Sequence, residues 1–210
     1  MDNSLRQYTQ IMLRKERKKI YFQYVLTLCF SVLCGGMFVP LLVDESLPGI
    51  LRQIAVHFEL SFFGSPSLFE SVLCVLRYSI PDLVCGGICF LFSFSTIHCF
   101  ISDLLLMIQG FGFGFSVWLL FQIEWARTPR FANGGYFFTF LFFRLCVLVL
   151  LTFLCAQTSI LAMTQTQDLR TGRFFLPIFS VRRLILLLIM FFMAVLLLTG
   201  LYALTLYYLF

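Results

Sequence analysis

The final long stretch of the sequence constrains the fold more than any other feature. Residues 184 to about 206 include no charged side chain. A run of about 20 apolar residues indicates a helix that crosses a bilayer rather than part of a soluble domain. Four more apolar runs cover residues 20–43, 80–100, 103–123 and 136–163. We therefore predict an all-α, polytopic transmembrane helix bundle with about five spans.

Composition supports a single membrane domain. Only 12% of the residues are charged, about half of what a soluble domain carries. The longest polar interval, residues 44–70, is too short and too apolar to form a separate core. We divide the chain into a basic cytoplasmic tail, residues 1–19, and a membrane domain, residues 20–210. Two stretches flanking or within the polar interval, residues 48–60 and 68–79, are predicted to be amphipathic helices at the membrane interface.

The distribution of positive charge predicts the topology and the partners. The net charge is +5, and a basic cluster directly precedes the first apolar run: Arg14, Lys15, Arg17, Lys18 and Lys19. Such a cluster is typical of a cytoplasmic flank that contacts membrane lipids. No aromatic side chain alternates with it as in a surface that stacks on bases, which argues against nucleic acid. Because residues 164–183 carry four more arginines, we expect the N-terminus inside and the C-terminus outside.

Residues 104–120 combine an apolar span with closely spaced glycines. In a helix, Gly110 and Gly114 lie on one face, and Gly112 and Ser116 lie on the opposite face. Each pair is a small-xxx-small motif, which allows a second helix backbone to approach closely. We therefore predict that this span is the middle of the bundle and packs against other helices on both faces.

The second and third spans are predicted to form an antiparallel hairpin, because the turn between them, residues 101–103, is short. Gly86 and Gly87 would allow the second span to contact a neighbour closely. His98 is expected in a solvated tip beside the turn, and Ser102 or Asp103 is the candidate cap for the third span.

Two charged residues are predicted inside the membrane. Arg144 lies about one third of the way into its apolar run, where an arginine costs a few kcal/mol unless it reaches the interface or finds a partner. Two alternatives remain open: the side chain extends toward the interface near Trp125, or it pairs with Glu124 or Asp82. Asp82 suits the positive N-terminal end of the second span.

The sequence carries no recognisable catalytic set, so we expect that the protein is not an enzyme. Its two histidines lie at the edges of apolar segments, and Asp82 and Asp103 are predicted at opposite ends of a hairpin. The eight cysteines form no C-x-x-C pair and read as small packing residues. We predict no cofactor and no metal site.

Residues 76–120 resemble the stage II sporulation protein M family. The similarity rests on Arg77, the apolar hairpin and the motif Gln109-Gly-Phe-Gly-Phe-Gly-Phe-Ser-Val117, and on the basic tail and the proline-containing loop after the glycine span. The resemblance implies a bacterial cell-membrane protein of the engulfment machinery in sporulation. Its partners would be peptidoglycan hydrolases that it tethers at the membrane.

Two functions are therefore weighed. The first is a membrane scaffold that holds other membrane or extracytoplasmic proteins. The alternative is a permease-type subunit of a small transporter, which needs convergent polar groups in the middle of the membrane. Asp82, Gln109 and Arg144 are the candidates, and the sequence does not put them at an evident common depth. For a scaffold we expect Gly110→Leu or Gly114→Leu to abolish assembly with partners and Arg144→Leu to matter little.

Overall fold

A computed structural model describes residues 3–41, 68–93, 95, 97–126, 135–170 and 178–209. Five helices make up nearly all of these residues: α1 (Asn3–Leu41), α3 (Leu68–Phe92), α4 (His98–Ala126), α5 (Gly135–Arg170) and α6 (Ile178–Leu209). The predicted all-α helix bundle is confirmed. The interfacial helix predicted at residues 48–60 lies outside the described residues.

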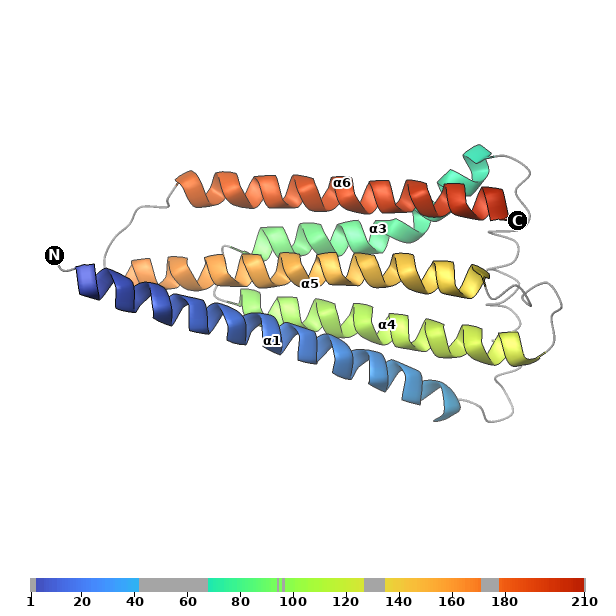
Figure 1. Cartoon of the computed structure of the whole chain (residues 1–210), viewed down its shortest axis with the longest axis horizontal. Helices are drawn as coiled ribbons and strands as arrows, with labels where there is room; N and C mark the ends of the chain where they lie inside the picture. The colour runs from blue at the N-terminus through green and yellow to red at the C-terminus, as the bar shows by residue number, and fades with distance from the viewer. Residues whose placement is uncertain are drawn as a thin grey trace.

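Four of the described helices are long and apolar enough to cross a membrane. The spans are Glu16–Val39, His98–Trp118, Leu141–Met163 and Val181–Thr205, and α3 contributes the shorter apolar segment Ser79–Phe92. The start of α1 and the end of α6 lie at opposite ends of the bundle (Figure 1). The chain is thus built as a multi-pass membrane protein, with four full-length spans and one shorter helix among the described residues.

Helix α3 differs from the prediction, which separated an interfacial helix, residues 68–79, from a span beginning at residue 80. One bent helix runs from Leu68 to Phe92 with Pro81 inside it (Figure 1). Proline removes a backbone donor, but a membrane helix tolerates it because neighbouring groups satisfy the freed carbonyl. Asp82 therefore lies inside a helix rather than at its N-terminal end.

The hairpin connection also lies earlier than predicted. Helix α3 ends at Phe92 and α4 begins at His98, so both Ser102 and Asp103 are inside α4 and neither caps it. The two helices run in opposite directions, as predicted (Figure 1).

The centre of the bundle is α5, and the prediction that the glycine-rich span occupies it is wrong. Helix α5 packs against α1, α3, α4 and α6. Its span is 56% buried, against 39% for the span of α4. Leu151 and Leu154 of α5 belong to the core, together with Leu106 of α4 and Val195 of α6. Glycines allow a close approach, but they do not fix how many helices surround the one that carries them.

The most extensive helix contact joins α1 and α4, and glycines on both helices permit it. A Cβ atom on Gly110 would lie 2.9 Å from the Cβ of Ser31. A Cβ on Gly114 would overlap the backbone carbonyl of Val32, and Gly35 of α1 makes the reciprocal contact with the backbone of α4. Because the obstructing atoms at Gly114 and Gly35 belong to the backbone, a larger residue there could not be accommodated by a rotamer change.

The opposite face of α4 does not show the predicted packing. A Cβ on Gly112 would meet no atom within 4 Å, and the Ser116 hydroxyl donates to the Gly112 carbonyl at 2.7 Å. On α3, Gly86 packs closely against the ring of Phe191, whereas a Cβ on Gly87 would meet no atom within 4 Å. The doubled motif therefore serves one helix contact within the described chain.

A polar cluster in the membrane interior as the candidate functional site

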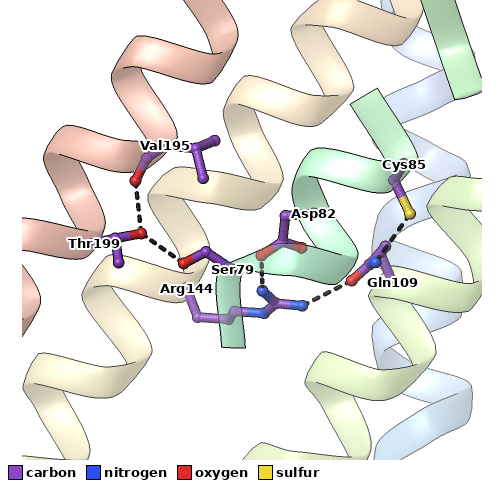
Figure 2. Close-up of polar contacts among 7 residues, drawn as sticks. All are labelled: Ser79, Asp82, Cys85, Gln109, Arg144, Val195 and Thr199. Carbon is purple, nitrogen blue, oxygen red and sulfur yellow. Dashed lines mark hydrogen bonds and ion pairs between the residues drawn. The ribbon is translucent and has the colours of Figure 1, made fainter. Parts of the chain in front are cut away.

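Three helices bring their polar side chains to one place inside the bundle. Asp82 comes from α3, Gln109 from α4 and Arg144 from α5 (Figure 2). Each is flanked by apolar residues on its own helix, so helix packing alone determines which polar groups meet.

Arg144 is the centre of this cluster. Its Nη1 donates to Asp82 Oδ2 in an ion pair, and its Nη2 donates to Gln109 Oε1 at 2.7 Å. Gln109 Nε2 in turn donates to Cys85 Sγ at 3.1 Å. The Asp82 side chain is 2% exposed, whereas that of Arg144 is 24% exposed. We call Asp82, Cys85, Gln109 and Arg144 the polar cluster.

The cluster lies within the apolar part of the bundle. Gln109 stands close to the midpoint of the span His98–Trp118, whereas Arg144 is the fourth residue of the span Leu141–Met163. The hydrogen bonds bring their side chains together. Of the alternatives that the sequence left open for Arg144, the structure gives pairing with Asp82. The side chains of Glu124 and Trp125 are outside the described part of the chain.

The physical reason for this pairing is the cost of a bare charge in lipid. A charged side chain at the bilayer centre is unfavourable by several kcal/mol. Arginine offers five donors in a fixed fork and pairs well with a carboxylate. Asp82 Oδ1 is buried and has no hydrogen-bond partner among the described residues, so Arg144 is the main compensation for the Asp82 charge.

A neutral hydrogen bond ties α6 to the same region. Ser79 and Thr199 share a hydrogen bond of 2.5 Å between their hydroxyl oxygens, one helical turn before Asp82 (Figure 2). Thr199 also bonds to its own helix at the Val195 carbonyl, 2.7 Å away. Helices α3, α4, α5 and α6 thus each contribute a side chain to this region.

A second polar layer surrounds the start of α4. His98 is completely buried, 2.9 Å from the Thr158 hydroxyl and 3.1 Å from the Ser102 hydroxyl. The expectation of a solvated histidine is therefore wrong, because α4 begins one turn earlier than predicted and its first residue packs on α5. Asp103 accepts a hydrogen bond from Gln23 of α1 at 3.1 Å.

Sequence reasoning named Asp82, Gln109 and Arg144 but did not place them at a common depth. The error came from the boundaries: starting α4 at residue 103 puts Gln109 near the membrane surface, whereas starting it at His98 puts the same residue near the middle. Cys85 was treated only as a packing residue. Its place one turn after Asp82 on α3 was the available signal. Among the described residues, no group of three or more His, Cys, Asp or Glu side chains could hold a metal ion.

Comparisons with known protein families, curated proteins and solved structures find no match to this chain. The arrangement of the site itself therefore carries the functional argument.

Proposed function

We propose that the protein is a non-catalytic membrane scaffold that holds other membrane or extracytoplasmic proteins at the bilayer. The observation that carries the proposal is that the members of the polar cluster bind one another. The guanidinium of Arg144 is bonded to Asp82 and Gln109, and the Gln109 amide continues to Cys85. Polar groups that bind one another across three helices fix the helix arrangement, and a fixed arrangement suits a protein that presents surfaces to partners.

The tight contact between α1 and α4 supports the same proposal. Helices in lipid associate through close packing rather than through water expulsion, and the backbones of α1 and α4 touch at Gly35 and Gly114. The two helices therefore form a rigid unit. The loop that follows α1 in the sequence, residues 44–67, is the candidate recruiting segment.

The partner class and orientation follow from the resemblance and the charge pattern. The resemblance to stage II sporulation protein M implies peptidoglycan hydrolases as partners, at the bacterial cell membrane during engulfment. The α1 and α6 helices begin at the same end of the bundle (Figure 1), and that end carries Arg17, Lys18, Arg182 and Arg183. By the positive-inside rule this end is cytoplasmic, which gives a cytoplasmic N-terminus and an extracytoplasmic C-terminus.

The experiment is a quantitative pull-down from solubilised membranes. One variant replaces residues 44–67 with a glycine-serine linker of equal length. A second is Asp82→Asn with Arg144→Gln, which removes both charges of the ion pair and keeps a polar side chain at each position. A scaffold loses its captured partners in the linker variant and keeps them in the double variant, once both are shown to fold. A partner set that is unchanged in the linker variant would contradict recruitment through this segment.

A permease-type subunit is the second candidate, and one observation favours it. Asp82, Gln109 and Arg144 converge within the apolar part of the bundle. Ionisable residues inside membrane spans commonly mark ion or substrate pathways, and Arg144 is 24% exposed. Proteoliposomes with an internal pH-sensitive dye test this function. A proton flux that the wild type supports and the Asp82→Asn/Arg144→Gln variant lacks would favour the permease over the scaffold.

A further inference from the structure

A cavity of about 440 Å³ opens between three helices, away from the polar cluster. Each helix contributes about one turn of side chains: Arg17 and Tyr21 from α1, Gln157, Ile160 and Leu161 from α5, and Arg183, Leu184 and Leu187 from α6. The volume is within the range of small-molecule sites, and the lining combines cationic, neutral polar and apolar groups.

The cavity lies where lipid headgroups meet the hydrocarbon core. Arg17 and Arg183 are each in the first turn of their membrane spans, and Gln157 is within two turns of the end of the span on α5. The polar and the apolar lining residues therefore face the boundary between headgroups and acyl chains.

The two arginines leave the cavity positively charged. Among the side chains that the structure describes, the ion pairs are Lys19 with Glu16 and Arg144 with Asp82, so none of these neutralises Arg17 or Arg183. A guanidinium binds a phosphate through two parallel hydrogen bonds and is a preferred group for phosphate recognition.

Tyr21 adds a neutral donor. Gln157 Nε2 donates to the Tyr21 hydroxyl oxygen at 2.5 Å. Because the oxygen accepts this bond, the Tyr21 O–H remains able to donate to a ligand. Gln157 thereby fixes the position of the hydroxyl in the wall of the cavity.

We propose that this cavity binds the phosphodiester headgroup of an anionic phospholipid. Arg17 and Arg183 bind the phosphate, and Tyr21 donates a hydrogen bond to it. Ile160, Leu161 and Leu187 contact the glycerol and the first methylene groups. A water-soluble phosphate would gain nothing from this apolar wall, whereas a lipid at the interface presents both chemistries at once.

The test measures lipid binding to the full-length protein in detergent by native mass spectrometry, with phosphatidylglycerol as the titrant. The cavity variant is Arg17→Gln with Arg183→Gln. The matched control is Lys18→Gln with Arg182→Gln, which removes the same charge from exposed neighbours on the same helices that do not line the cavity. We expect the cavity variant to bind about tenfold or more weakly, as for lost charge-assisted hydrogen bonds, and the control to stay within about threefold of wild type.

Three results would overturn the proposal. Equal weakening in both double variants would mean a general attraction of basic residues for anionic lipid. Phosphatidylcholine binding as tightly as phosphatidylglycerol would exclude recognition of the anionic headgroup. Displacement of the lipid by glycerol 1-phosphate, at the concentration at which the lipid itself binds, would identify a soluble phosphate as the ligand.

Discussion

Helix α4 takes part in two contacts that are built on opposite chemistry. Toward α1 it presents Gly110 and Gly114, where the two backbones touch, while Asp103 near its start accepts hydrogen bonds from α1. Toward α3 and α5 it presents Gln109, which binds Arg144 beside Asp82. At the glycines the first contact depends on the absence of side chains, and the second contact depends on specific polar atoms.

The difference teaches that the two contacts respond to different substitutions. In the glycine contact any added volume is harmful, because the atoms in the way belong to the backbone. In the polar cluster volume matters less than charge balance, because removing one partner leaves the other unpaired in lipid. Substitutions that change only one of these properties separate the two contacts.

The largest effect is expected for Asp82→Leu. This change leaves the Arg144 guanidinium with only Gln109, and breaking a buried ion pair from one side costs about 3–5 kcal/mol. Reversible unfolding by SDS in mixed micelles measures the loss. The double change Asp82→Leu/Arg144→Leu should recover a large part of it. If the double variant lost the sum of the two single effects, the pair would not be energetically coupled. The structure thus also revises the expectation that Arg144→Leu alone matters little.

A smaller effect is expected for Gly114→Leu, with Gly112→Leu as the matched control. The leucine at 114 must displace the Val32 carbonyl, and overpacking of this kind costs about 1–3 kcal/mol or more. The leucine at 112 enters open space and should change stability by less than about 0.5 kcal/mol. The same unfolding assay compares the two variants. If both leucine variants were equally destabilised, the Gly110 and Gly114 face of α4 would not be the face that packs on α1. Because Gly110 and Gly114 pack within the chain, losses of partner binding in their leucine variants would report folding rather than recruitment.

The smallest effect is expected for Thr199→Val. The change keeps the side-chain shape and removes the hydrogen bond to Ser79 across α3 and α6, a kind of bond worth about 0.6 kcal/mol in membrane proteins. Thr205→Val is the control, since its hydroxyl donates to the Leu201 carbonyl on its own helix. A Thr199→Val variant as stable as the control would mean that the contact between α3 and α6 rests on packing alone, including that of Gly86 on Phe191.

Sequence reasoning succeeded where one helix decides the outcome and failed where two helices do. The glycine spacing in α4 predicted two closely packed glycine faces. The structure shows close packing at the Gly110 and Gly114 face but not at Gly112. The position of Arg144 showed that a charge had to be satisfied, but not by which side chain. Pro81 suggested a helix boundary that the structure does not have, because tertiary contacts override a local signal of this strength.

By itself, the sequence determined the membrane class and the all-α bundle, because long uncharged apolar runs have few other stable arrangements in or out of lipid. Only the tertiary structure decided that α5 is central, that Asp82, Gln109 and Arg144 meet at one depth, and that Arg17 and Arg183 face one cavity. These features depend on the rotation and the axial shift of one helix against another. Small differences in packing set both, and the pattern along a single helix does not encode them.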